Sequence, residues 1–304
     1  MNENFMSREE NSIIRIENIT KDYGNQKGVF NISFEVKKGE VMGFLGPNGA
    51  GKTTTIRQLM GFIKPDSGSV KILSMDCFKE AAKIQKHLSY LPGEIAFMED
   101  MTGVEFIRFI GKMKGMKDTR RMKELTAFFE LDARGKIKKM SKGMKQKIGL
   151  VCAFMDEPEI LILDEPTSGL DPLMQNRFVE LILEEKKKGA TILMSSHMFE
   201  EVERTCDRTA IIKNGRLVAV ETLEKLKESK RKIFELKAAS EEEATELSKA
   251  LPGSEKKGVW VNTTDEGNMD GFLKKISHFS IADMNVRTQT LEELFMNYYG
   301  EELK

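Results

Sequence analysis

The sequence predicts an α/β protein with a core built on a mixed, mainly parallel sheet, followed by a second, smaller α/β domain. Three observations predict this class. An apolar run at residues 41–45 leads directly into a glycine-rich loop. Short apolar runs, typical of buried strands, alternate along the chain with segments of helical periodicity. A charged stretch at residues 225–232 is followed by a fresh start of the same alternation, which indicates a second domain.

Charge and cysteine use restrict the class of protein further. At 304 residues the chain suits one large domain or two. Lys plus Arg and Asp plus Glu both total 48, and the resulting zero net charge argues against a broad nucleic-acid surface. The three cysteines, Cys77, Cys152 and Cys206, are far apart and lack metal-binding spacing. We therefore expect reduced cysteines and no nucleic-acid partner.

The sequence contains no pattern typical of a signal peptide or of a membrane-spanning helix. Residues 1–5 are polar and acidic, without an apolar stretch behind a basic start. The best apolar run covers only residues 148–155, whereas a spanning helix needs about 20 residues. Any role at a membrane is therefore expected to depend on a partner chain.

The first part of the chain is predicted to be rich in strands. Apolar residues alternate at period two on both sides of a turn at 23–25. The expected strands are 13–16, 29–36, 41–45, 69–73 and 87–91, and a helix is expected at 54–62. From residue 102 to about 155 the period becomes helical, which predicts a helical subdomain at about residues 95–155.

Strand character returns at residues 160–163 and 190–194. Between these strands, Asp171 and Pro172 suit the N-cap and first position of a helix, which Gly189 ends. A hairpin is expected at 210–220, because Asn-Gly between two apolar runs is the strongest short hairpin signal. These elements complete a first domain at residues 12–228.

A separate accessory domain is expected at residues 230–304. Its strands are predicted at 233–237, 258–262 and 280–287, and its helices at 240–251, 269–277 and 291–299. The last helix carries an apolar stripe of Leu291, Leu294, Phe295 and Tyr298. This stripe suits packing either against its own domain or against a partner chain.

The glycine-rich loop matches the phosphate-binding pattern G-x-x-x-x-G-K-[ST]. Its glycines permit positive φ angles, so that successive backbone N–H groups converge on phosphate oxygens at a helix N-terminus. Lys52 is placed to reach the β- and γ-phosphates, and Thr53 to join a Mg²⁺ shell. The predicted nucleotide-binding residues are Gly46, Pro47, Asn48, Gly49, Ala50, Gly51, Lys52, Thr53 and Thr54.

A pair of acidic residues follows the apolar strand at 160–163. In a parallel sheet such a strand delivers Asp164 at its carboxyl end, where ligands bind. Asp164 suits contact with Mg²⁺, and Glu165 suits activation of an attacking water. The alternative is that Asp-Glu-Pro only ends the strand and begins a turn.

These residues carry a resemblance to ATP-binding cassette (ABC) ATPases. Leu-Asp-Glu-Pro-Thr-Ser-Gly-Leu-Asp-Pro at 163–172 resembles their Walker B motif and D-loop, and the phosphate loop resembles their Walker A motif. Residues 140–147 occupy the place of the family's signature, usually Leu-Ser-Gly-Gly-Gln. His197 falls where the family has a switch histidine, and Tyr23 where an aromatic ring stacks on adenine. The resemblance covers roughly residues 12–225.

The resemblance implies a composite site shared by two chains. The signature residues would contact the γ-phosphate of ATP held by the partner. His197 would sense the γ-phosphate and hold Glu165 with the D-loop of the opposite chain. The signature residues are Ser141, Lys142, Gly143 and Met144, and the D-loop residues are Ser168, Gly169, Leu170 and Asp171. Ser141 also suits an ordinary helix N-cap, and Tyr23 also suits a core position at a strand end.

The sequence departs from the family pattern in two places. Lys142 and Met144 stand where Gly and Gln are usual, a variant similar to that of ABC-2-type exporter ATPases. The family's Q-loop glutamine is replaced by Gly93-Glu94. Because Gly93 has no side chain, either Glu94 or water would complete that side of a Mg²⁺ site.

We therefore identify the chain as similar to ABC-transporter ATPase subunits of the ABC-2-type exporter group. This implies a P-loop core with an antiparallel β front and a helical subdomain. It also implies ATP hydrolysis with Mg²⁺, a homodimer or paired ATPase subunit, and a membrane-spanning permease on whose cytoplasmic side the chain is peripherally bound. The alternatives are a soluble ABC ATPase acting on ribosomes or nucleic acid, and a nucleotide-dependent regulatory module. The transported substrate is not encoded in this chain.

Overall fold

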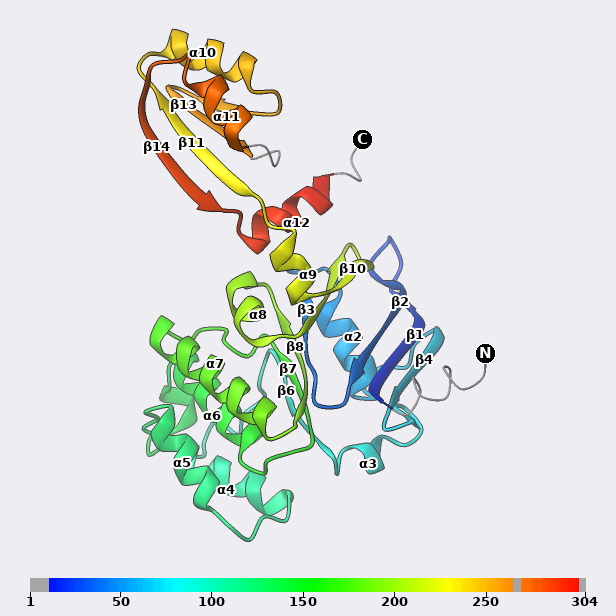
Figure 1. Ribbon diagram of the computed structural model, residues 1–304. Helices are drawn as coiled ribbons and strands as arrows, with labels where there is room; N and C mark the ends of the chain where they lie inside the picture. Colours follow the sequence, from blue (N-terminus) through cyan, green and yellow to red (C-terminus); the bar gives the residue numbers. More distant parts are fainter. Residues whose placement is uncertain (1–10, 265–268, 301–304) are drawn as a thin grey trace. The chain divides into compact units, whose positions relative to one another are not determined.

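The computed structural model describes residues 11–264 and 269–300, excluding the side chains of 296–300. The chain forms two compact units that divide after Leu223 (Figure 1). The polar start at residues 1–5 and the Tyr298 side chain lie outside the described part. Each unit is described by itself below.

An antiparallel sheet forms the front of the first unit. Its strands are arranged in the order β2-β1-β4-β5. Alternate residues of β1, including Ile14 and Ile16, are buried, so the period-two pattern corresponds to one face in the core. The strands are β1 (Ser12–Asp22), β2 (Gly28–Lys37), β4 (Ser67–Ile72) and β5 (Met75–Asp76). The predicted β front is thus confirmed.

A six-stranded sheet forms the core of the same unit, in the order β10-β9-β3-β8-β7-β6. The neighbouring strands from β9 to β6 are parallel, and only β10 is antiparallel to its neighbour. The strands are β3 (Val41–Leu45), β6 (Leu88–Leu91), β7 (Ile160–Asp164), β8 (Thr191–Ser196), β9 (Arg208–Lys213) and β10 (Arg216–Thr222). Every residue of β3, β7 and β8 is buried, as expected of parallel strands covered on both faces.

The helices of the first unit begin at the caps that the sequence offers. Asp171 accepts a hydrogen bond from Met174 N and so caps α7. Helix α2 begins at Lys52 rather than at the expected residue 54, because Gly51 turns the chain directly into it. The helices are α2 (Lys52–Leu59), α3 (Ala81–Ile84), α4 (Gly103–Met113), α5 (Arg120–Phe128), α6 (Lys142–Phe154), α7 (Pro172–Lys187) and α8 (Phe199–Thr205), with a 3₁₀ turn at Ile137–Lys139.

The helical subdomain is built on α6. Helices α4 and α5 pack on α6, which in turn packs on β6 (Figure 1). The methionines of this region divide between inside and outside: Met122, Met140 and Met155 are buried, whereas Met98 and Met113 are exposed. None of the helices in the described part of the chain is long and apolar enough to cross a membrane.

The second unit has an antiparallel sheet with strands in the order β12-β13-β11-β14. Helices α10 and α11 lie over one face of it (Figure 1). The elements are α9 (Leu223–Glu228), which begins at the division, β11 (Lys232–Ala238), α10 (Glu241–Ala250), β12 (Glu255–Lys257), β13 (Trp260–Thr264), α11 (Met269–Ile276), β14 (Ile281–Thr288) and α12 (Leu291–Gly300). From β11 to β14 the order β-α-β-β-α-β is that of ferredoxin-like domains. The short strand β12 was not expected from the sequence.

This unit has its own apolar core, which Phe234, Leu236 and Leu247 share with other buried residues. On α12, Leu291, Leu294 and Phe295 are buried within the single chain. These three members of the predicted stripe are therefore covered without a partner chain.

Candidate functional site

Three loops meet at the carboxyl edge of the six-stranded sheet. They follow β3, β7 and β8, which lie side by side because β8 runs between the other two. Ser195 of β8 is in register with Phe44 of β3 and with Asp164 of β7. This register brings the glycine-rich loop, the acidic pair and His197 to one place.

The glycine-rich loop is shaped to surround an anion. Gly49 and Gly51 have φ angles of 79° and 112°, in the region that favours glycine. A Cβ atom on Gly51 would lie 2.6 Å from the Val29 side chain, so a larger residue does not fit. Lys52 is only 6% exposed and its Nζ donates to the Gly46 carbonyl at 2.6 Å. The cation thus already points into the loop where phosphate oxygens would lie.

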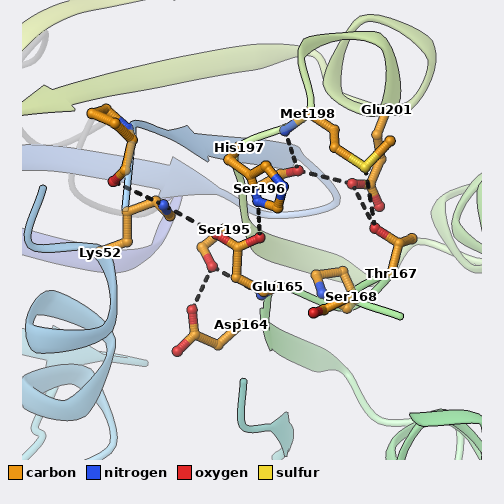
Figure 2. A network of polar contacts seen from close by, with 12 residues as sticks. Lys52, Asp164, Glu165, Thr167, Ser168, Ser195, Ser196, His197, Met198 and Glu201 are labelled. Carbon is orange, nitrogen blue, oxygen red and sulfur yellow. Dashed lines mark hydrogen bonds and ion pairs between the residues drawn. The ribbon is translucent and has the colours of Figure 1, made fainter. Parts of the chain in front are cut away.

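Lys52, Glu165 and His197 form a continuous cluster (Figure 2). Lys52 Nζ lies 3.0 Å from Glu165 Oε1, and His197 Nδ1 lies 2.6 Å from Glu165 Oε2. The His197 side chain is 51% exposed, so this histidine is not a buried structural residue. Glu165 has a φ angle of 50°, an uncommon conformation for a non-glycine residue and one often found at functional sites. A carboxylate thus lies within hydrogen-bond reach of both an imidazole and an ammonium group.

Asp164 offers a buried carboxylate oxygen that accepts no hydrogen bond from the described part of the chain. It is fully buried, and its Oδ1 accepts a hydrogen bond from Ser195 Oγ (Figure 2). Its Oδ2 is buried without a hydrogen-bond partner among the described residues. A buried free carboxylate oxygen fits a Mg²⁺ ion or one of its waters, because hard cations prefer oxygen ligands.

The Q-loop position faces this carboxylate through Gly93 rather than through Glu94. A Cβ atom on Gly93 would lie 3.5 Å from Asp164 Oδ2. The side chain of Glu94 is exposed. Gly93 therefore lies directly beside Asp164 but offers no side-chain ligand there.

The signature residues lie against the D-loop of the same chain. Lys142 Nζ donates to Ser168 Oγ at 2.9 Å, and a Cβ atom on Gly143 would lie 2.7 Å from the Gly169 carbonyl oxygen. Ser141 caps α6, since its Oγ accepts from Met144 N at 3.2 Å. The unusual Lys142 therefore has a local role in joining the two loops.

Tyr23 lies in the turn between β1 and β2, and its side chain is 54% exposed. The alternative of a core tyrosine is therefore wrong. Strand β2 begins beside the glycine-rich loop, where Gly51 approaches Val29. The turn that carries Tyr23 therefore lies on the same side of the first unit as the glycine-rich loop.

The site contains polar residues that the sequence reasoning missed. Ser195 Oγ accepts from Glu165 N at 3.0 Å, and Thr167 and Ser196 both donate to Glu201. Glu201 is buried, and this burial raises the pKa of its carboxyl to about 7, while the hydrogen bonds from Ser196 and Thr167 act in the opposite direction. The contacts Glu165–Ser195 and Thr167–Glu201 join positions about 30 apart in the sequence, so no spacing rule would have selected them; only Ser196 and Glu201 are close in sequence.

Comparison with known proteins gives one consistent result. The "ABC transporter" family model matches residues 29–168. The linearmycin resistance ATP-binding protein LnrL of Bacillus subtilis is 40% identical over 215 residues, which are 69% of each chain. The bacitracin transport ATP-binding protein BcrA of Bacillus licheniformis is 37% identical over 239 residues, 78% of each chain. A solved ATP-binding subunit of an ABC transporter is 34% identical, with a TM-score of 0.66 over 71% of this chain and 92% of that one.

The fold is shared with a solved ATP-binding subunit. On it, the phosphate loop follows β3, the acidic pair ends and follows β7, and the histidine follows β8, which is the order along the chain that the resemblance implied. The identity to LnrL over two thirds of both chains establishes the family. This chain belongs to the ATP-binding subunits of ABC transporters and is an ATPase.

Proposed function

We propose that this chain works as a pair of ATPase subunits that energise a separate membrane-spanning permease, and that the permease exports its substrate. The Lys52–Glu165–His197 cluster carries the proposal, because it combines a phosphate-binding cation, a base and an orienting group. Similarity to a resistance protein and to a bacitracin transport protein supports export. A position on the cytoplasmic side of the membrane follows from this partnership.

Each residue of the cluster has a distinct role in the proposal. Lys52 binds the β- and γ-phosphates of ATP, and the backbone of residues 46–51 surrounds them. Glu165 accepts a proton from the attacking water. His197 donates a hydrogen bond from its Nδ1–H group to the Glu165 carboxylate and so holds it in place.

Thr53 and Asp164 are the proposed Mg²⁺ ligands. Thr53 is exposed in the first turn of α2, and Asp164 Oδ2 has no hydrogen-bond partner among the described residues. Bound Mg²⁺ would neutralise charge on the phosphate oxygens. We propose that water, and not Glu94, completes this side of the Mg²⁺ shell, since Gly93 has no side chain and the side chain of Glu94 is exposed.

The second ATP contact is proposed to come from a partner chain. Ser141 and Gly143 lie at the N-terminus of α6, where backbone N–H groups and the helix dipole favour a phosphate. Within one chain Gly143 packs against Gly169, and the neighbouring Lys142 donates to Ser168 Oγ. Tyr23 is proposed to stack on adenine of its own chain's nucleotide, because its ring is exposed.

The decisive experiment compares Glu165→Gln with the wild type. The variant should bind a fluorescent ATP analogue with affinity near that of the wild type, while phosphate release falls by about 10²–10⁴-fold. Glu185→Gln is a matched control, because Glu185 is a buried glutamate that pairs with Arg121 and Lys188 away from the cluster. Turnover by Glu165→Gln close to that of the wild type would refute the assigned base.

A further inference from the structure

Glu201 on α8 is a buried carboxyl group that accepts hydrogen bonds from two hydroxyl groups. Its side chain is 5% exposed, and its Oε2 accepts from Ser196 Oγ at 2.9 Å and from Thr167 Oγ1 at 3.2 Å (Figure 2). Its Oε1 is buried with no hydrogen-bond partner in the described part of the chain. Burial of such a group is unfavourable unless its hydrogen bonds are well formed.

The two hydroxyl groups belong to the loops that carry the base and its orienting histidine. Thr167 follows Glu165 in a turn closed by the hydrogen bond from Ser168 N to the Glu165 carbonyl at 3.1 Å. Ser196 directly precedes His197, and its Oγ also accepts from Met198 N at 2.9 Å. The Ser196 hydroxyl therefore fixes the backbone on both sides of the histidine.

A purely structural role explains Glu201 less well. Glu185, the comparable buried glutamate on α7, lies 2.7 Å from Arg121 and 3.0 Å from Lys188, so cations compensate its burial. The hydrogen-bond partners of Glu201 are neutral hydroxyl groups. Hydrogen bonds to two hydroxyl groups are directional, so this network can set the relative geometry of the groups that it joins.

We propose that Glu201 is a positioning residue of the ATPase site: it joins the turn after Glu165 to the loop of His197 and thereby sets the contact between them. The inference rests on the proposed roles of Glu165 and His197. It assigns Glu201 no contact with ATP, so its loss should act on turnover and not on nucleotide binding.

The kinetic test uses Glu201→Ala and Glu201→Gln in the full chain. Glu201→Ala should lower kcat by about tenfold or more, because small displacements of reacting groups cost up to about 10²-fold. ATP affinity should stay within about twofold of the wild type. Glu201→Gln keeps an oxygen that can accept from both hydroxyl groups, so it should restore kcat to within about threefold.

The chain also permits a readout that is independent of activity. It contains only three histidines, so histidine-selective ¹³C labelling gives three imidazole signals, and His197→Ala identifies one of them. Glu201→Ala should shift the His197 signal and leave those of His87 and His278 unchanged. Ser196→Ala and Thr167→Val each remove one hydroxyl group with little change in volume, and they should shift the same signal if Glu201→Ala fails to fold.

Several results would overturn the proposal. For Glu201→Ala, these are a kcat within twofold of the wild type, a loss of ATP affinity as large as the loss of kcat, or an unchanged His197 signal. A loss of kcat in Glu201→Gln as large as that in Glu201→Ala would also refute it. The Glu165→Gln variant distinguishes a failure of the proposed ATPase function from a failure of the proposed role of Glu201. If Glu165→Gln remains active, the proposed function fails; if it is inactive while Glu201→Ala is normal, only the role of Glu201 fails.

Discussion

Glu165 is held from three sides by residues of different strands and loops. Lys52 and His197 contact its two carboxylate oxygens, and Ser195 Oγ accepts from its backbone N–H. The backbone in the left-handed region costs on the order of 1–2 kcal/mol. These contacts offset that cost and fix the orientation of the carboxylate. At the scale of single residues, the position of Glu165 is therefore set by contacts within the chain itself.

The ionisation of Glu201 predicts a pH-dependent stability difference. Burial raises its pKa from 4.5 to about 7, with the charge of Glu165 acting in the same direction. Between these values the native chain holds a proton that the unfolded chain releases, so stability falls as pH rises. Glu201→Gln lacks this titration. Its free energy of unfolding relative to the wild type should therefore rise by about 2–3 kcal/mol between pH 5 and pH 8.

Urea unfolding of both chains at several pH values measures this difference. The buried Cys206 thiol also interacts electrostatically with Glu201, but its pKa is raised to about 12 and it does not titrate in this range. Parallel stability curves for the two chains from pH 5 to pH 8 would show that Glu201 is ionised normally in the folded state.

The hairpin of β9 and β10 supports the glycine-rich loop through its turn. Asn214 and Gly215 both have positive φ angles, 49° and 74°, as a two-residue type I′ turn requires. Gly215 N donates to the Ala50 carbonyl at 2.9 Å, and Phe30 N donates to the Gly215 carbonyl at 2.7 Å. At the scale of elements, this turn joins the parallel sheet, the antiparallel sheet and the loop.

Gly215→Ala should therefore destabilise the unit and weaken ATP binding. The added Cβ would lie 2.3 Å from the Gly28 carbonyl oxygen, in addition to the φ cost of about 1–2 kcal/mol. Gly189→Ala is a matched control, since Gly189 has a φ of 91° but no atom within 4 Å of the added Cβ. Unfolding free energies should fall clearly more for Gly215→Ala than for Gly189→Ala. Equal losses would show that the close approach to Gly28 is relieved without cost.

At the scale of the whole molecule, the two units predict a separable nucleotide-binding part. All proposed nucleotide-contacting residues lie at or before His197, and the second unit has its own core. A chain ending after Glu228 should fold and bind a fluorescent ATP analogue within about twofold of the affinity of the full chain, since no contact residue is removed. Loss of ATP binding would place the boundary elsewhere. Sedimentation of the shortened chain with ATP then tests whether the second unit contributes to dimer formation.

The proposed pairing of two chains predicts complementation between two inactive variants. In that proposal Lys52→Ala removes the phosphate-binding cation, and Ser141→Arg disables the signature that would serve the partner's ATP. A mixture should form dimers with one intact composite site and show ATP turnover that neither variant shows alone. The control mixture pairs Lys52→Ala with the Lys52→Ala, Ser141→Arg double variant, which leaves no intact site. Equal activity of the two mixtures would refute shared sites.

The sequence by itself determined the elements and the chemistry within each loop. The apolar runs of β3, β7 and β8, the cap at Asp171 and the Asn214-Gly215 turn depend on neighbours only a few positions apart. The phosphate loop and the acidic pair are local patterns as well, so they were predictable. The expected helix start at residue 54 was wrong by two positions, because the geometry of Gly51 was not visible in the periodicity.

The tertiary structure, and not the local sequence pattern, decides which of these loops meet. Strand β8 lies between β3 and β7, and this order brings His197 to Glu165 and Ser195 to Asp164. The same arrangement brings Glu201 within hydrogen-bond distance of Thr167 and Ser196, one residue from each loop. Strand order depends on packing among segments more than 100 residues apart in the sequence, such as β3 and β8. Local propensity and spacing carry no information about such contacts, because they arise only when the buried faces of the sheet are assembled.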